Sequence, residues 1–122
     1  MATGLFFPTS VFGSLPRPDY VKDLVNGAVP VEPDEYRRLM GLAVSAAVAL
    51  QEAAGLDVVT DGEWWRKSYL GVIAELAHGF ELGTYPDGRP YTVVVDRLAP
   101  RQPGFIAREV SFLRGITHTQ IK

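Results

Sequence analysis

The sequence predicts an α/β fold built on parallel strands, and three observations support this prediction. A strongly periodic helical segment begins near Glu32 and ends before Gly55. A short run rich in β-branched residues, 56–60, follows directly after that glycine, and another apolar run, 5–13, precedes the helix. A strand that leaves a helix after one glycine is the α-to-β connection of a β-α-β unit, whose two strands are almost always parallel.

The first part of the chain is expected to form a strand, a turn and a short helix. Residues 5–13 form the predicted strand, and the segment Ser14–Pro18 ends it because its two prolines cannot continue a ladder. Asp19 is the predicted N-cap of a short helix that ends at Leu24 or Val25, before Asn26-Gly27.

The long helix is the clearest element of the sequence. Pro33 lies early in it, and Asp34 and Glu35 fall in its first turn, where carboxylates complement the helix dipole. Gly55 suits the position just past its end. One face of the helix carries residues at helical spacing that we expect to pack on the sheet: Tyr36, Leu39, Met40, Ala43, Val44, Ala47, Val48 and Gln51.

The second half of the chain is expected to contain a further helix, a β-hairpin and the opening of another strand. The helix is indicated by Trp65, Tyr69, Val72 or Ile73, and Leu76 at helical spacing, and it ends near Gly79. Several shorter elements are then predicted: a hairpin of Phe80–Tyr85 and Tyr91–Val95 around the turn 86–88, a loop at 99–103, an extended segment at 105–110, a helical turn at 111–115, and a strand that opens at Thr119–Lys122.

This order of elements is typical of the first part of a larger α/β domain. Two parallel strands do not form a stable sheet alone, because a parallel sheet is normally covered on both faces and protected at its edges. A complete small α+β domain of 122 residues is the alternative.

The composition excludes several classes of function. Lys and Arg total 12 against 14 Asp and Glu, so a nucleic-acid or anionic-membrane surface has no electrostatic support. The absence of cysteine excludes a disulfide framework, a thiol nucleophile and a thiolate zinc site made by this chain alone. Residues 1–8 do not resemble a signal peptide, and the apolar stretch 39–50 is too short to cross a bilayer. We therefore expect a cytoplasmic protein.

The carboxyl ends of the two expected strands define a candidate binding site. Adjacent parallel strands lie about 4.8 Å apart, so residues beyond these ends can share one ligand at the edge where α/β folds bind ligands. Ser14 follows one strand and Asp61-Gly62-Glu63 the other. Ser14 offers a hydroxyl and a backbone N–H, and Glu63 offers a carboxylate for an ammonium group or a proton. The alternative is an ordinary Asp-Gly turn, with Glu63 as a first-turn acid of the next helix.

Two segments resemble motifs of the cobalamin-independent methionine synthase family, in its C-terminal catalytic barrel. The run Thr9–Pro18, TSVFGSLPRP, resembles the opening motif that contains G-S-x-P-R-P. The run Gln51–Glu63, followed by Arg66, resembles Q-x-x-x-G-L-D-x-x-x-D-G-E-x-x-R. The resemblance extends more weakly to the hairpin and to Gln120-Ile121-Lys122, where a third barrel strand would begin.

The resemblance implies that residues 1–122 form the N-terminal part of a (β/α)₈ TIM barrel with an inserted β-hairpin. It also implies a methyltransferase that moves a methyl group from 5-methyltetrahydrofolate to the thiol of homocysteine, which a zinc ion binds, to make methionine. The family's zinc ligands, His, Cys, Glu and Cys, belong to later strands. Here only His78 and His118 remain, with no partner at metal-ligand spacing. The expected partners are therefore the thiol substrate, the methyl donor and the remainder of the barrel, in the same or another chain.

The family motifs also imply roles for individual residues. No residue of the chain is matched to a catalytic or metal-binding role. Arg17 and Arg66 match motif arginines for which we expect structural or electrostatic roles at the rim. The amino-acid substrate is expected to contact the backbone of Phe12, Gly13 and Ser14 and the hydroxyl of Ser14. Its ammonium group is expected to contact the carboxylate of Glu63.

Other interpretations remain open at this point. The chain could belong to a related thiol alkyltransferase of the epoxide–thiol type, or it could be a truncated, non-catalytic fragment. Trp65 is expected to join Tyr69 and Ile73 in the core, whereas Trp64 would lie toward the rim, either packed there or stacked on a ligand. Three arginines could meet a polyanionic folate tail or simply be solvated: Arg97, Arg101 and Arg108.

Overall fold

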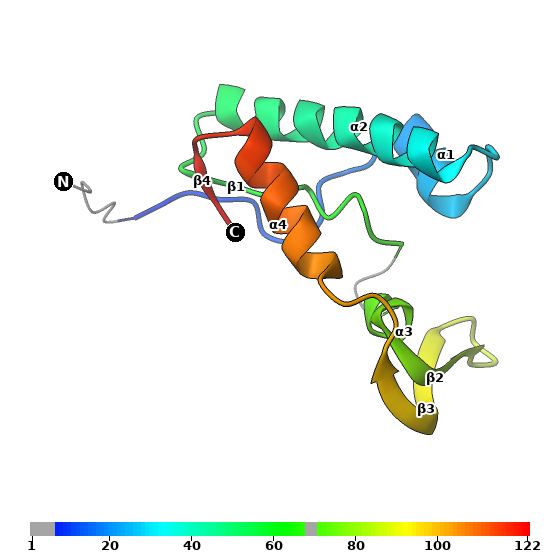
Figure 1. Ribbon diagram of the computed structural model, residues 1–122. Coiled ribbons are helices and arrows are strands. Elements are labelled where there is room, and N and C mark those ends of the chain that lie inside the picture. The colour runs from blue at the N-terminus through cyan, green and yellow to red at the C-terminus, as the bar shows by residue number, and fades with distance from the viewer. Residues whose placement is uncertain (1–6, 68–70) are drawn as a thin grey trace. The chain divides into compact units, whose positions relative to one another are not determined.

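The computed structural model describes residues 7–67 and 71–122. They divide into two compact units. The core unit comprises the chain up to Trp65 together with 109–122, and the hairpin unit comprises 66–108. Figure 1 labels the elements of both.

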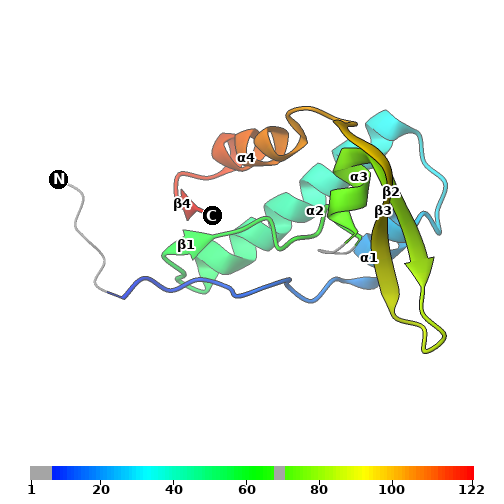
Figure 2. The same ribbon diagram turned by 90° about the horizontal axis from the view of Figure 1, so that it is seen from below.

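The core unit contains a small parallel sheet. Strand β1 (Val58–Val59) pairs in parallel with β4 (Gln120–Ile121), and Ser10 forms an isolated parallel bridge to Val58. Figure 2 shows β1 lying between the N-terminal segment and β4. The predicted parallel arrangement is therefore confirmed. Both expected strands are shorter than predicted, because pairing in the described part of 5–13 is limited to Ser10 and the strand expected at 56–60 is limited to Val58–Val59. Residues 5 and 6 lie outside the described residues.

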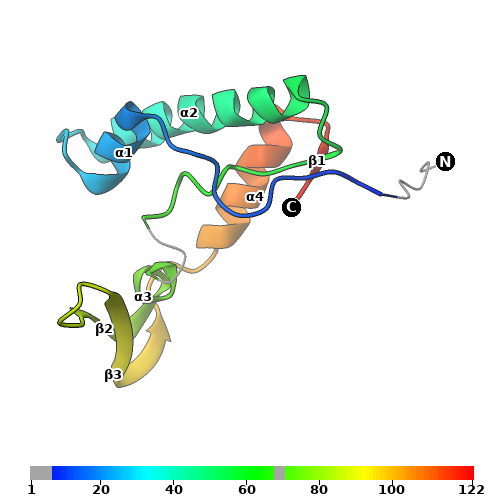
Figure 3. The same cartoon turned by 180° about the vertical axis from the view of Figure 1, so that it is seen from behind.

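Helices α1 (Asp19–Asn26) and α2 (Pro33–Ala53) complete most of the core unit, with the last part of α4 (Phe105–Ile116). The predicted face of α2 is buried from Met40 onward, whereas Tyr36 and Leu39 are half-buried. Figure 3 shows this helix running alongside β1. A fully buried Met or Val side chain stabilises a fold by roughly 1.5–3 kcal/mol, so this face dominates the stability of the unit. The buried apolar core consists of Val21, Val25, Met40, Ala43, Val44, Ala47, Val48, Val59, Trp64 and Leu113.

Gln51 joins α2 to the end of β1. Its side chain is 2% exposed, and its Nε2 donates to the carbonyl oxygen of Thr60 at 2.8 Å. The backbone N–H of Thr60 donates in return to Oε1 of Gln51 at 3.0 Å. The amide side chain thus pairs with the backbone of Thr60 as a neighbouring strand would, and it fixes the start of the loop that carries Glu63.

Two carboxylates hold neighbouring segments together at the amino-terminal ends of the strands. Asp57 accepts hydrogen bonds from the backbone N–H and the hydroxyl of Thr9, both at 2.8 Å, and these bonds lower the pKa of its carboxyl group. Glu52 accepts hydrogen bonds from the hydroxyls of Thr117 and Thr119, which lower its pKa in the same way. The N-terminal segment and β4 are therefore both anchored to the connection between α2 and β1.

The hairpin unit contains α3 (Val72–Leu76) and an antiparallel pair, β2 (Ala77–Thr84) and β3 (Pro90–Pro100). The predicted hairpin is confirmed, and it extends further along the chain than the sequence pattern indicated. The pairing shifts between His78 and Phe80. At Gly79, with φ of 89°, an added Cβ would lie 2.6 Å from the carbonyl oxygen of Arg97, so only glycine fits this irregularity.

Four sequence-based expectations about secondary structure are wrong. Asp19 is the first residue of α1 rather than its N-cap, since Pro18 takes the cap position and its carbonyl accepts from the N–H groups of Val21 and Lys22. The predicted loop at 99–103 begins too early, because β3 continues to Pro100.

The segment 105–110 is helical rather than extended, since it forms the first half of α4. The buried face of α4 carries Glu109 one turn before Leu113, and this acidic residue interrupts the apolar period on which the prediction depended. The helix expected from Trp65 is limited to α3 in the described residues, and Tyr69 lies outside them. Within the described ranges, no helix is long and apolar enough to cross a membrane.

Candidate functional site

The segments that follow Ser10 and β1 lie side by side in the core unit. The backbone N–H of Leu15 donates to the carbonyl oxygen of Gly62 at 3.1 Å. The indole Nε1 of Trp64 donates to the carbonyl oxygen of Leu15, also at 3.1 Å. Parallel strands bring their carboxyl ends to one edge of a sheet, and these cross-links hold the two loops together there. The predicted common edge is therefore confirmed.

Ser14 and Glu63 meet at this edge. The Ser14 hydroxyl donates to Oε2 of Glu63 at 2.8 Å, although 49 positions separate the two residues in the sequence. Ser14 is exposed and Glu63 is half-buried, so both polar side chains are accessible from solvent. A carboxylate oriented in this way can accept charge-assisted hydrogen bonds from an ammonium group.

The backbone of Glu63 has an unusual conformation. Its φ is 58°, in the left-handed region that favours glycine. Among the described residues, no other non-glycine residue has a positive φ. Its N–H donates to Oδ1 of buried Asp61 at 2.8 Å, and its carbonyl oxygen accepts from Nη2 of Arg17 at 2.7 Å. Left-handed backbone costs about 1–3 kcal/mol for a non-glycine residue, and such strain clusters at functional sites.

This conformation was not predicted from the sequence. The available signal was Asp61-Gly62 directly before Glu63, since an aspartate side chain readily accepts from the backbone N–H two residues later. Residues 62–65 form a turn, and a residue in the left-handed region does not belong to a right-handed helix. The alternative interpretation of Glu63 as a first-turn helical acid is therefore wrong.

Both tryptophans near the site serve packing. Trp64 is 5% exposed and belongs to the core, so its expected place toward the rim is wrong. An added Cβ at Gly62 would lie 3.2 Å from the Trp64 ring, which shows how closely the loop passes over it. Trp65 packs against the core as expected, and its ring meets that of Phe112 edge-to-face at 5.7 Å. The expected core position of Ile73 is wrong, since this residue is 52% exposed, and Tyr69 lies outside the described residues.

Phe12 and Gly13 present their backbone at this edge, whereas their neighbour Ser14 also presents a hydroxyl group. The Phe12 side chain is 99% exposed, so it makes almost no contact within the chain. Gly13 has a φ of 74°, and an added Cβ there would meet nothing within 4 Å. A ligand at this edge could therefore approach the backbone of both residues closely.

The described residues do not fit a zinc site. They contain no group of three or more His, Cys, Asp or Glu side chains that could hold a metal ion, and the chain has no cysteine. His78 is exposed on β2, and His118 is exposed in the loop between α4 and β4. The two histidines belong to different units.

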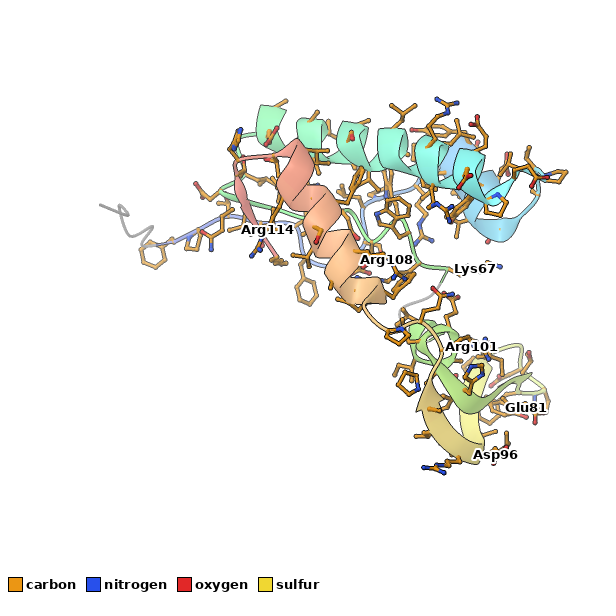
Figure 4. All side chains as sticks on the ribbon, viewed as in Figure 1. Lys67, Glu81, Asp96, Arg101, Arg108 and Arg114 are labelled. Carbon is orange, nitrogen blue, oxygen red and sulfur yellow. The ribbon has the colours of Figure 1, made fainter. Side chains whose placement is uncertain are left out.

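The other candidate arginines lie outside the core unit. Arg66, Arg97, Arg101 and Arg108 all belong to the hairpin unit, and Figure 4 labels the last two. Arg97, Arg101 and Arg108 are exposed, whereas Arg66 is half-buried. The guanidinium of Arg108 lies 6.0 Å from the centre of the Phe105 ring, a contact that suits a solvated helix-end residue.

Comparisons with known proteins give consistent results, although no family model matches the chain. A methionine synthase of Sulfolobus acidocaldarius is 29% identical over 122 aligned residues, which cover 93% of this chain and 35% of the relative. A 5-methyltetrahydropteroyltriglutamate–homocysteine methyltransferase of Thermodesulfovibrio yellowstonii is 32% identical over 80 residues, which cover 62% of this chain and 10% of the relative.

A solved structure agrees with these relatives. The B12-independent methionine synthase of Shewanella sp. W3-18-1, determined in complex with selenomethionine, matches with a TM-score of 0.71 and 25% identity. The match covers 93% of this chain and 36% of that chain. The chain thus spans about a third of the length of the Sulfolobus acidocaldarius relative and of this structure. With the two sequence motifs, these findings show that the chain is similar in sequence and in structure to cobalamin-independent methionine synthases over about a third of their length.

Proposed function

We propose that the protein carrying this chain transfers a methyl group from 5-methyltetrahydrofolate to the thiol of homocysteine and so makes methionine. In this proposal, residues 1–122 form the first part of a (β/α)₈ barrel with an inserted hairpin. The names of the relatives and the similarity of the structure to a B12-independent methionine synthase support the proposal.

We assign the Ser14–Glu63 pair to the amino-acid end of homocysteine. The Glu63 carboxylate accepts hydrogen bonds from the substrate ammonium group, and the backbone of Phe12, Gly13 and Ser14 contacts the rest of the amino-acid moiety. The observation that carries this assignment is the hydrogen bond between Ser14 and Glu63, because it joins the two family motifs at one accessible point.

The chain's own residues bind and orient the substrate, and they leave thiol activation to another part of the protein. A bound zinc ion would favour the thiolate form of the substrate. Since the described residues do not fit a metal site, we assign the zinc ligands to residues outside this chain. A free thiol has a pKa of about 8.5 and is mostly protonated at neutral pH, so we expect the 122-residue chain alone to be inactive.

Steady-state kinetics of the complete protein that carries this sequence would test the proposal. We expect Glu63→Gln to raise the KM for homocysteine by roughly tenfold to a hundredfold, the scale of losing a charge-assisted hydrogen bond of about 1–3 kcal/mol. The KM for the methyl donor should stay within about twofold, because the proposal assigns Glu63 to the ammonium group of homocysteine and not to the donor. Glu81→Gln, which removes an exposed carboxylate of β2, is the matched control and should change neither constant.

Two outcomes would replace the proposal. If the complete protein makes no methionine but alkylates a thiol with a different donor, it is a related thiol alkyltransferase. If it binds no thiol and makes no product, the non-catalytic interpretation is correct. An unchanged KM for homocysteine in Glu63→Gln would overturn the role of Glu63 alone.

A further inference from the structure

Arg17 contacts the backbone of the residue that carries the proposed binding carboxylate. Its Nη2 lies 2.7 Å from the carbonyl oxygen of Glu63, and the Arg17 side chain is half-buried. The contact is therefore with the main chain of Glu63, whereas the carboxylate of Glu63 contacts Ser14. Arg17 and Ser14 thus hold Glu63 at two different points.

The left-handed conformation of Glu63 needs such support. At φ of 58° the Cβ of a non-glycine residue is crowded by its own backbone, so this conformation persists only where surrounding contacts hold it. One support is the bond from the Glu63 N–H to Oδ1 of Asp61, and the other is the bond from Arg17 to the Glu63 carbonyl oxygen. Together they fix the peptide groups on both sides of the Glu63 Cα atom, and hence the direction of its side chain.

Arg17 is itself presented by a stiff segment. Pro16 and Pro18 flank it, and each proline restricts the backbone of its own position and of the residue before it. Leu15, two residues earlier, is tied to the Glu63 loop by bonds through its N–H and its carbonyl oxygen. The backbone at Arg17 therefore has few alternative conformations. This restriction lowers the conformational entropy lost when the guanidinium bonds to Glu63.

We propose that Arg17 is a positioning residue, which holds Glu63 in its left-handed conformation and so directs the Glu63 carboxylate toward Ser14 and the substrate. Arg17 acts through Glu63 and does not itself contact the substrate. This role depends on the proposed function, which assigns Glu63 to the ammonium group of homocysteine. The proposal explains the presence of Arg17 in the first family motif by its contact with Glu63, which lies in the second motif.

A double-mutant cycle in the complete protein tests the proposal. We expect Arg17→Met to raise the KM for homocysteine at least tenfold and to leave the KM for the methyl donor within about twofold. The double variant Arg17→Met/Glu63→Gln should bind homocysteine no more weakly than Glu63→Gln alone, because the proposed effect of Arg17 on the substrate passes through that carboxylate. Arg114→Met, which removes an exposed arginine of α4, is the matched control and should have no effect.

A second readout reports on the backbone directly. In protein labelled with ¹³C-glutamate, the Cα and Cβ chemical shifts of Glu63 distinguish left-handed from other backbone conformations. We expect these shifts to change in Arg17→Met and to stay unchanged in Arg114→Met. If Arg17→Met does not fold, Arg17→Lys keeps the charge and most of the aliphatic stem, and it should show smaller changes in the same direction.

The outcomes separate this proposal from the proposed function. If Glu63→Gln weakens homocysteine binding but Arg17→Met does not, or if the two effects multiply in the double variant, the role of Arg17 is wrong. If Glu63→Gln has no effect on homocysteine, the substrate assignment fails, and the shifts of Glu63 decide on Arg17. Shifts that remain left-handed in Arg17→Met would then overturn its positioning role, and shifts that change would support it.

Discussion

The core unit buries a cluster of apolar side chains, whereas large apolar side chains on both strands of the hairpin unit are exposed. In the core unit, α2 buries Met40 and Val44 completely. In the hairpin unit, large apolar side chains of both strands are exposed, including Leu82 at 58%, Val94 at 54% and Leu98 at 51%. A two-stranded hairpin alone is marginally stable in water, so we expect the core unit to hold most of the stability within the described residues.

Polar groups show the same contrast. In the core unit, hydrogen bonds join segments that are far apart in the sequence, as between Thr9 and Asp57 or between Ser14 and Glu63. In the hairpin unit, the side-chain hydrogen bonds at the turn are local, as between Asp87 and Arg89. Long-range polar contacts therefore accompany the buried core, and the candidate site lies among them.

The largest expected effect is a loss of stability when the core of α2 is truncated. Met40→Ala should lower the free energy of unfolding by about 2–5 kcal/mol, because it removes buried contacts and leaves a cavity. The matched change in the hairpin, Leu82→Ala, should cost less than about 0.5 kcal/mol. Denaturant unfolding followed by circular dichroism measures both. Equal losses of unfolding free energy in the two variants would contradict the proposed difference in stability between the units.

A smaller effect is expected where Gln51 pairs with the backbone of Thr60. Gln51→Leu removes both hydrogen bonds and leaves a buried N–H and carbonyl group without partners, at a cost of about 1–3 kcal/mol. Gln102→Leu, in the exposed loop before α4, is the control and should change stability by less than about 0.5 kcal/mol. A Gln51→Leu variant as stable as the control would show that the amide does not support the end of β1.

The smallest effect concerns pH. The hydrogen bonds from Thr9 lower the pKa of Asp57, and those from Thr117 and Thr119 lower the pKa of Glu52. A carboxyl group whose pKa is lowered in the folded state stabilises it above the ordinary value, and this contribution is lost as the pH falls through the lowered folded value. We therefore expect stability to fall as the pH drops below the ordinary values of 4.5 for Glu52 and 3.8 for Asp57.

The double variant Glu52→Gln/Asp57→Asn tests the origin of this dependence. Its stability should fall less steeply in acid than that of the unchanged protein, whereas Glu81→Gln on the hairpin should leave the slope as it was. Chemical unfolding at a series of pH values between about 3 and 7 gives the slopes directly. If stability falls with pH at the same slope in the double variant, groups other than Glu52 and Asp57 cause the loss of stability in acid.

The parts of the fold that follow from local rules were predictable from the sequence. The apolar period of α2, the Asp-Gly turn of the hairpin and the single glycine between α2 and β1 each have one dominant physical reason, and the structure confirms the elements that they predict. The parallel direction of β1 and the Ser10 segment followed from the connection rule, and so did the common edge that holds Ser14 and Glu63.

The features that were not predicted depend on contacts between distant segments. The left-handed backbone of Glu63 is held by Arg17 from another part of the chain, which no local pattern reveals. Helix α4 carries a buried Glu109 on its core face, so its apolar period is broken in the sequence although the helix forms. Trp64 is buried in the core, and its indole N–H donates to the carbonyl oxygen of Leu15 across the two loops.

The central claim is that Ser14 and Glu63 form one binding point for an amino-acid ammonium group. Isothermal titration calorimetry of homocysteine with the complete protein tests it most directly, with Glu63→Gln and Glu81→Gln compared under the same conditions. We expect the Kd to rise by roughly tenfold or more in Glu63→Gln and to remain unchanged in Glu81→Gln. The same Kd in both variants and in the unchanged protein would contradict the claim.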